Sequence, residues 1–326
     1  MNSTVLDEVL IKAEAETNPQ YGHKPSDRPL EEHIKKGIVN LDKPAGPTSQ
    51  QVTSWVKNIL KVKKAGHSGT LDPKVTGVFP IGIEDSTKII HTVLPSRKEY
   101  VAFLRLHSEV KESKLQETLD YFQGELFQRP PLKSSVKRKL RKRTIYEIEL
   151  IESEGQNILI RINCEAGTYI RKLCHDIGLV LGTGAHMQEL RRTKAGPFDE
   201  SSIVKLHDLK DTYEFYNENG DEKQLRNYIH PIESGVMHLR KIWLKDSAVS
   251  AICHGAMLNA PGVARLSNGI QKDDFVALMT LKDELVALAR SHKKSDEIME
   301  MNHGVVASLE AVIMAPNIYP KKWGKD

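Results

Sequence analysis

The sequence predicts two domains: a mixed α/β domain with flanking helices, followed by a small β-barrel. At 326 residues, the chain exceeds the usual size of one domain. Strand and helix patterns are interspersed from Gly37 to Gly184, whereas the segments after Leu239 are short and β-rich. We therefore expect an arm over residues 1–36, a larger domain over 37–236 and a small domain over 237–326, with the arm packed on the small domain.

Composition limits the classes of protein that fit this chain. Lys and Arg number 47 against 43 Asp and Glu, a net charge of +4, so the distribution of charge matters more than its total. The three cysteines are an odd number without C-x-x-C spacing, which argues against a disulfide framework and a cysteine zinc site. No segment is apolar enough for a secretory signal or a membrane helix. A soluble, cytoplasmic protein without a membrane partner is expected.

The elements of the larger domain follow from apolar periodicity and turn residues. The arm is expected to be extended, with a short helix over Leu30–Lys36. Thr48 and Gln51 form a T-x-x-Q capping box, which predicts a helix starting there. The further elements predicted are strands over Gly37–Leu41, Val78–Ile83 and Tyr100–Leu106, helices from Asp85 or Ser86 to Leu94 and around Leu115–Phe122, a hairpin of Thr144–Ile151 with Ile158–Cys164, and a helix from Gly167 to Gly182.

The last third of the chain is predicted to be a surface loop followed by short strands. Residues Tyr213–Gln224 are dense in Asn, Asp and Glu, which is typical of a loop or a domain boundary. Short strands are predicted at Ile242–Leu244, Val263–Leu266, Phe275–Met279, Leu285–Ala289 and Val305–Leu309.

The most informative stretch is Gly66-His67-Ser68-Gly69-Thr70-Leu71-Asp72-Pro73. Three nearby glycines, at 66, 69 and 77, offer positive φ values that other residues resist, so the loop could hold Asp72 rigidly toward a cleft. The alternative is a surface turn in which Asp-Pro only ends the preceding element.

A basic run lies between Arg129 and Arg143. No acidic residue interrupts it, and Pro130-Pro131 stiffens its start, which favours contact with a phosphate backbone over a solvated loop without a partner. Its basic residues are Arg129, Lys133, Lys137, Arg138, Lys139, Arg141, Lys142 and Arg143.

Three more residues are candidates for a site around Asp72. Arg171, in the first turn of a predicted helix, could hold a carboxylate ionised through its fixed guanidinium; it could also be an ordinary surface arginine. Tyr100 begins a strand, where packing is its commonest role, but its ring could stack on a nucleobase if it borders the cleft. His67 could fix the loop or contact RNA.

Several motifs of other enzyme classes fail. Thr70 occupies the position where G-x-S-x-G requires its second glycine, so the Asp72 loop is not a nucleophile elbow. Gly182-Thr183-Gly184 lacks the third glycine of a dinucleotide fingerprint and follows a predicted helix. No phosphate-binding G-x-x-x-x-G-K-[ST] loop is present. Chemistry that depends on a nucleotide cofactor or on ATP therefore loses support.

Five segments, in the same order along the chain, resemble the motifs of TruB-type pseudouridine synthases. They are Asn40-Leu41-Asp42-Lys43-Pro44, Gly66 to Gly77, Lys98-Glu99-Tyr100, Arg129-Pro130-Pro131 to Lys137, and Gly167 to Gly178. The arm around Glu16–Gly22 and the C-terminal region are similar to archaeal relatives of dyskerin, the catalytic subunit of H/ACA guide-RNA particles. The resemblance implies a catalytic domain on a mixed, largely antiparallel sheet and a C-terminal PUA domain.

The resemblance also implies the chemistry. Asp72 would be the catalytic aspartate, Tyr100 the ring against the target uridine and Arg171 the partner of Asp72, with His67 and Lys43 as support. The N1–C1′ bond of uridine would break and the base would rejoin through C5, without a cofactor or a metal. Asp72 could attack the sugar, attack the base or remove a sugar proton.

The expected partners are an H/ACA guide RNA, a ribosomal or transfer RNA substrate, and the small accessory proteins of the particle. The alternatives are a stand-alone transfer-RNA pseudouridine-55 synthase and a non-catalytic scaffold that assembles RNA. One departure from the PUA pattern is Asp273-Asp274 in place of Gly-Asp, which makes a turn with positive φ less favourable, although Asp tolerates this region better than most residues.

Overall fold

A computed structural model describes residues 8–130, 137 and 139–321 of the chain. The chain divides into two units, each of which is described by itself. Residues 38–230 form one of them, the central unit. The described residues up to Gly37 and those from Pro231 onward form the other, the terminal unit.

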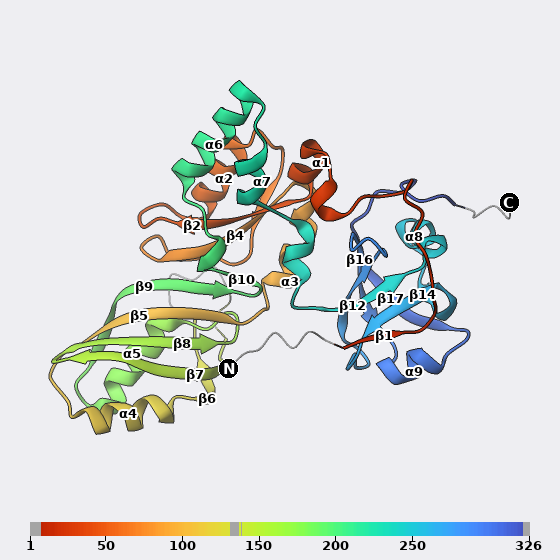
Figure 1. Cartoon of the computed structure of the whole chain (residues 1–326). Helices are drawn as coiled ribbons and strands as arrows, with labels where there is room; N and C mark the ends of the chain where they lie inside the picture. The colour runs from red at the N-terminus through yellow and green to blue at the C-terminus, as the bar shows by residue number, and fades with distance from the viewer. Residues whose placement is uncertain (1–7, 131–136, 138, 322–326) are drawn as a thin grey trace. The chain divides into compact units, whose positions relative to one another are not determined.

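A mixed, largely antiparallel sheet forms the framework of the central unit (Figure 1). The strand order is β11-β2-β4-β9-β5-β8-β7-β6, with β3 paired to β4 and β10 paired to β9. The β4–β9 pairing is parallel, whereas β2–β4, β5–β8, β5–β9, β6–β7 and β7–β8 are antiparallel. The strands are β2 (Gly37–Lys43), β3 (Ala65–His67), β4 (Thr76–Ile83), β5 (Lys98–Leu106), β6 (Gly124–Gln128), β7 (Arg141–Glu154), β8 (Asn157–Cys164), β9 (Ala185–Ala195), β10 (Phe198–Asp199) and β11 (Ile229–Pro231).

Helices cover this sheet. The predicted capping box is confirmed, because the Thr48 hydroxyl accepts from Gln51 N and the Gln51 side chain accepts from Thr48 N. One helix, α5, packs on β9, and α4 packs on α5 and β7. The helices are α2 (Ser49–Ile59), α3 (Ile90–Val93), α4 (Glu112–Tyr121), α5 (Ile170–Leu181), α6 (Leu206–Asn219) and α7 (Lys223–Tyr228), with 3-10 turns at η2 (Glu84–Ile89) and η3 (Glu200–Ser202).

Two features of the central unit differ from the sequence prediction. The prediction of a loop over the polar segment Tyr213–Gln224 is wrong, because α6 and α7 span most of it. The apolar stripe of α6 is narrow, and only Leu209 and Tyr213 are buried in it. The sequence also failed to predict β9, which lies between β4 and β5 although it carries few apolar residues.

The terminal unit is a seven-stranded sheet that includes a strand from the arm. In this sheet β1 pairs with β14, with Val9 opposite Ser267. The strand order is β1-β14-β12-β15-β16-β17-β13. Its elements are β1 (Val9–Ile11), η1 (Pro25–Asp27), α1 (Leu30–Lys35), η4 (Ile232–Val236), β12 (Arg240–Leu244), α8 (Asp246–Cys253), β13 (Leu258–Asn259), η5 (Ala260–Gly262), β14 (Val263–Ser267), β15 (Phe275–Met279), β16 (Leu285–Ser291), α9 (Ser295–Glu300) and β17 (Val305–Val312).

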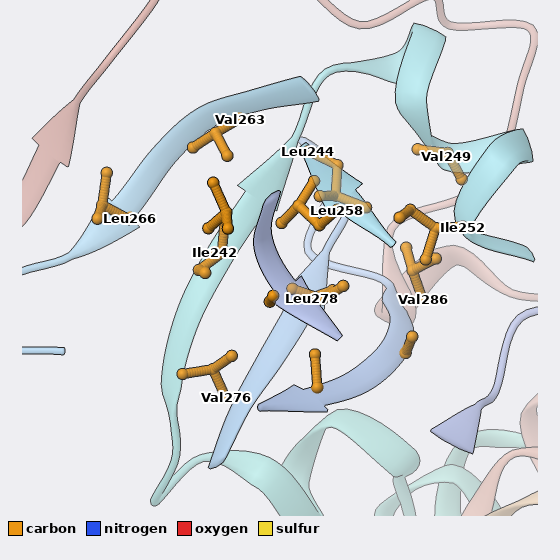
Figure 2. Packing of buried hydrophobic residues seen from close by; sticks show 14 of the residues in the cluster. Ile242, Leu244, Val249, Ile252, Leu258, Val263, Leu266, Val276, Leu278 and Val286 are labelled. Atoms are coloured by element: carbon orange, nitrogen blue, oxygen red, sulfur yellow. The ribbon is translucent and has the colours of Figure 1, made fainter. Parts of the chain in front are cut away.

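The core of the terminal unit lies between its strands and α8. Figure 2 shows Ile252 of α8 near Val286, and both belong to one buried cluster with Val249 and Leu258. At the turn before β15, Asp273 adopts φ +69°, so this aspartate takes the left-handed backbone that a glycine would adopt more readily. Of the helices in the described residues, none is both long and apolar enough to span a membrane.

Candidate active site

The loop that carries Asp72 is fixed by hydrogen bonds to the start of α2 and to β2. The Ser49 hydroxyl, at the first residue of α2, donates to Leu71 O at 3.0 Å and accepts from Leu71 N at 2.9 Å. On the other side of Asp72, Gly46 N donates to Pro73 O at 2.9 Å. The backbone on both sides of Asp72 is therefore held, which leaves the carboxylate a restricted position.

Lys43 also holds this loop in place. Its side chain is fully buried, and its ammonium donates to the carbonyls of Pro44, Pro73 and Val75 at 2.9–3.0 Å. Burial lowers the pKa of Lys43, while the Asp72 charge opposes that shift. Three carbonyl acceptors compensate for part of the lost hydration. Lys43 thus anchors the loop through its backbone.

His67 has a similar structural position. Its Nδ1 accepts a hydrogen bond of 3.4 Å from Gly69 N, and its ring packs on Phe79 with centroids 5.1 Å apart. Burial, followed by the charge of Arg192, lowers the pKa of His67 below its usual range. The imidazole is therefore neutral at pH 7, and the contacts described are with the loop and the sheet.

Two of the three glycines near Asp72 adopt the positive φ that the sequence suggested. Gly69 has φ +124° and Gly77 has φ +101°. A Cβ on Gly77 would stand 2.2 Å from the carbonyl oxygen of Arg192, so only glycine lets β4 approach β9 there. Gly66 instead lies in β3 without a positive φ.

Arg171 is positioned by the segment that precedes α5. The buried Gln128 side chain, at the end of β6, accepts from Tyr169 N at 2.8 Å and donates to Tyr169 O at 3.1 Å. The Glu165 carboxylate accepts from Thr144 N at 3.0 Å and pairs with Arg143. These bonds tie the start of α5 to β6 and β7, which sets the place of Arg171 two residues later.

The structure brings Arg171 and Asp72 together in an ion pair within the central unit. Arg171 Nη2 donates to Asp72 Oδ2. The two side chains are 58% and 54% exposed, so the pair faces solvent. An open carboxylate that already has a cationic partner is available to a substrate that approaches from solution.

Tyr100 lies on the buried face of β5, opposite Arg192 of β9. The two side chains hydrogen-bond to each other, and burial raises the pKa of the phenol, an effect that the Asp72 charge reinforces. Tyr100 thus lies within electrostatic reach of Asp72. Only 9% of Tyr100 is exposed, so little of its ring is open to a base in this conformation.

Arg192 is the residue of the site that the sequence prediction missed. It is 1% exposed, its Nε donates to Val78 O at 2.8 Å, and its Nη2 has no hydrogen-bond partner. Desolvation lowers its pKa, and its charge in turn lowers the pKa of Lys43 and His67. The only signal in the sequence was the pair Arg191-Arg192 in a strand without clear alternation.

The basic run divides into residues with and without acidic partners. Arg129, Lys137 and Lys139 are exposed, whereas Lys133 and Arg138 lie outside the described residues. Arg141 begins β7, opposite Gln128. Lys142 pairs with Glu125 at 2.7 Å, and Arg143 pairs with Glu165 at 3.3 Å, so acids from other segments neutralise part of the run.

Carboxylate, guanidinium and phenol together suit a reaction in which an ionised acid attacks or deprotonates a substrate. No group of three or more His, Cys, Asp or Glu in residues 8–130, 137 and 139–321 is arranged to hold a metal ion. Burial raises the pKa of Cys164 and Cys174 to about 12, which makes either thiol a poor nucleophile.

Comparison with protein families matches four regions of the chain. The TruB family pseudouridylate synthase N-terminal domain matches residues 57–170, and the tRNA pseudouridylate synthase B C-terminal domain matches residues 171–237. A PUA domain matches residues 240–313, and the DKCLD (NUC011) domain matches residues 4–53.

Similar proteins extend over nearly the whole chain. "Probable tRNA pseudouridine synthase B" of Methanopyrus kandleri is 54% identical over 97% of this chain and 94% of its own. The protein of the same name from Methanothermobacter thermautotrophicus is 54% identical over 99% and 100%.

Two solved structures have the same fold. A chain in an H/ACA RNP bound to a substrate RNA containing 2′-deoxyuridine has a TM-score of 0.93 and 50% identity, and a chain in a Cbf5-Nop10-Gar1 complex has a TM-score of 0.93 and 53% identity. Each alignment covers 98% of both chains. The chain therefore belongs to the TruB family of pseudouridine synthases, which isomerise uridine to pseudouridine, and it carries a C-terminal PUA domain.

Proposed function

We propose that this chain is the catalytic subunit of an H/ACA guide-RNA particle and isomerises selected uridines of ribosomal RNA, with Asp72 as the essential catalytic residue. The observation that carries the proposal is the Asp72–Arg171 pair, held on a rigid loop and open to solvent. The two similar chains from H/ACA assemblies support the guided form of the reaction. Small accessory proteins such as those in these assemblies are the expected partners.

The reaction conserves atoms. The N1–C1′ bond of uridine breaks, the base turns, and a C5–C1′ bond forms; C5 loses its proton and N1 gains one. Because a stacked and paired base is not accessible to the Asp72 carboxylate, the RNA supplies a flipped nucleotide and the protein supplies a fixed acid beside it. Arg171 and Lys43 act as positioning residues, the first by pairing with the carboxylate and the second by anchoring its loop. His67 fixes the same loop, and Tyr100 contacts the target base once the RNA is bound.

The exposed members of the basic run, with Lys133 and Arg138, are proposed to contact RNA phosphates. Arg129, Lys137 and Lys139 are exposed, and within the described residues no ion pair with an acid involves them. Arg141, Lys142 and Arg143 continue the run into β7, where the last two already have acidic partners.

The test is Asp72→Asn, which keeps the shape of the side chain and removes its charge. The release of tritium from RNA labelled at uridine C5 should fall to background, while binding to guide RNA annealed to its substrate stays within a few-fold of wild type. Full tritium release would refute the role of Asp72. Equal loss of binding would assign Asp72 to RNA binding rather than to chemistry, and absence of tritium release from the wild type would favour the scaffold function.

A second candidate is a stand-alone transfer-RNA pseudouridine-55 synthase, which the names of the relatives favour. Unmodified transfer RNA and a ribosomal fragment should be offered with and without guide RNA. The guided proposal expects the ribosomal fragment to be modified only with the guide. Guide-independent modification of every natural target would overturn it.

A further inference from the structure

A polar groove in the central unit lies beside α2, apart from the residues that hold Asp72. Its volume is about 440 Å³. It is lined by α2, by the segment between α2 and β3 and by η2, and its donors include Lys57, Lys63, Lys64, Gln50 and Ser54. Neither the family comparison nor the reaction assigns a role to this groove.

The three lysines of the groove have no acidic partner within the described part of the chain. One carboxylate lies beside the segment that carries Lys63 and Lys64: Glu84 Oε1 accepts from Lys63 N and, at 3.3 Å, from Lys64 N. Its single negative charge offsets only part of the positive charge of the three exposed lysines, and the remaining positive charge attracts anions. The groove therefore favours a polyanionic ligand.

The segment that presents Lys63 and Lys64 is held in place. Glu84 N donates to Lys64 O at 3.0 Å, in addition to the bonds that the Glu84 carboxylate accepts. Lys61 has φ +52° and Glu84 has φ +45°, a left-handed backbone that costs free energy for residues other than glycine. Lys61 follows the end of α2, where a left-handed residue is common, and Val62 N donates to Lys57 O at 3.1 Å. The backbone that carries the two lysines is thus held in place.

The groove lies close to the Asp72 loop along the chain. Ala65 lines the groove and begins β3, and Asp72 follows seven residues later. A chain segment of that length spans at most ~25 Å even when fully extended. An RNA strand that delivers a nucleotide to Asp72 is long enough to reach the groove as well.

We infer that this groove binds the phosphodiester backbone of the RNA that delivers the target uridine to Asp72. The inference rests on the proposed function, because it presumes an RNA substrate. Lysine ammonium groups, an amide and a hydroxyl suit phosphate oxygens, and none of the lining residues is aromatic, so base stacking is not provided. The groove positions RNA without reading its sequence.

The first experiment measures the salt dependence of binding. The triple variant Lys57→Ala, Lys63→Ala, Lys64→Ala is titrated with a fluorescein-labelled H/ACA guide RNA annealed to its substrate strand, over a range of KCl concentrations. Each lost phosphate contact lowers the slope of log K against log salt by about 0.7 to 0.9, so the slope should become shallower by about 2. Kd at fixed salt should rise about 10-fold or more.

The matched control removes the same charge elsewhere in the central unit. Lys111, Lys205 and Lys223 are exposed, and their replacement by Ala lowers the net charge equally. This control should keep the wild-type slope within about half a unit. Equal slopes for the two triple variants would overturn the inference, because the effect would then be one of net charge only.

The second experiment locates the RNA directly. Ser54→Cys, in a Cys253→Ser background, carries a tethered iron chelate that cleaves nearby RNA backbone; Glu117→Cys on α4 is the control position. Cleavage at discrete nucleotides from Ser54 alone supports the groove. Absence of cleavage from Ser54 would overturn the inference. Binding of inorganic phosphate to the wild type but not to the triple variant, with RNA affinity equal in both, would assign the groove to a small free anion instead.

A third measurement separates this inference from the proposed function. At saturating RNA and low salt, the triple variant should release tritium from C5-labelled uridine at a rate within about 3-fold of wild type, since its Asp72 site is intact. Normal turnover with an unchanged salt slope would sink the groove inference alone. Failure of Asp72→Asn to lose activity would sink the proposed function alone.

Discussion

The Arg171 guanidinium donates a hydrogen bond from Nη2 to Asp72 Oδ2, across 99 residues of sequence. Both side chains are more than half exposed, and exposed ion pairs of this kind stabilise a fold by only ~0–1 kcal/mol. Their pairing is therefore weak evidence for a role in stability and stronger evidence for a role in chemistry.

Arg171→Ala is expected to lower kcat about 100-fold through misplacement of the carboxylate, with little change in Tm. Arg171→Lys should recover only part of the rate, because an ammonium lacks the planar fork of the guanidinium. The matched control is Arg161→Ala, which breaks an exposed ion pair with Glu149 on the same sheet. An equal rate loss in both variants, measured by tritium release, would contradict the role of Arg171.

Arg192→Met should change the ionisation of its neighbours. The Arg192 charge lowers the pKa of His67, after burial, so its removal should move the pKa of His67 upward toward its usual range. A pH titration of the histidine ring signals by NMR measures this, with His67→Gln to assign the resonance. Loss of the hydrogen bond to Tyr100 should also reduce kcat, by about 10-fold or more. An unmoved His67 titration would show that Arg192 does not act through charge.

The buried ammonium of Lys98 should make the stability of the fold depend on pH. Burial lowers its pKa to about 7, although its ammonium donates to Val93 O at 2.7 Å. Between pH 7 and the unfolded-state value of 10.5, the unfolded chain binds more protons than the folded one, so stability rises with pH in this window and is lowest below pH 7. The contribution of Lys98 to this rise is at most about 5 kcal/mol.

Lys98→Met should therefore flatten the rise in unfolding free energy between pH 7 and pH 10, measured by urea denaturation followed by circular dichroism. Lys194→Met is the control, because Lys194 lies on the neighbouring strand β9, is about half exposed and pairs with Glu99. Parallel pH profiles for wild type and Lys98→Met would refute the assignment of the effect to Lys98.

Asp273→Gly should stabilise the chain by about 0.5–1 kcal/mol, because the position requires a positive φ and the Asp273 hydrogen bonds described are made by its backbone. Asp283→Gly is the contrasting variant. Asp283 also has a positive φ, but its carboxylate accepts from Trp243 Nε1 at 2.7 Å, so the gain should be cancelled. Thermal unfolding compares the two, and a lower Tm for Asp273→Gly would contradict the prediction.

Elements with strong local signals could be predicted from the sequence. The helix after Thr48 has a complete capping box and buries Val52 and Val56, and the hairpin of β7 and β8 follows from alternation with a short turn. The fold class, which rests on these patterns and on the family motifs, is confirmed by the family and structure comparisons. The sequence also suggested that Arg171 reaches Asp72, and the structure contains that ion pair.

Other features depend on tertiary contacts that leave no periodic trace. The strand β9 is held by hydrogen bonds to β4 and β5 while its own residues are largely polar, so apolar alternation could not find it. Arg192 was not predicted, because its burial depends on side-chain contacts with Val78 and Phe79 of β4, which lies far away in the sequence. Helix α6 needed only Leu209 and Tyr213 for its apolar contacts, too few to separate it from a polar loop.

The pairing of β1 with β14 also has a consequence for synthesis of the chain. Val9 cannot pair until Ser267 has been synthesised. At ribosomal rates of about 5–20 residues per second, the arm therefore stays unpaired for roughly 13–50 s. The central unit emerges whole during that interval and can fold first. The terminal unit closes last, by adding the earliest-made strand to the edge of a sheet built from the latest-made ones.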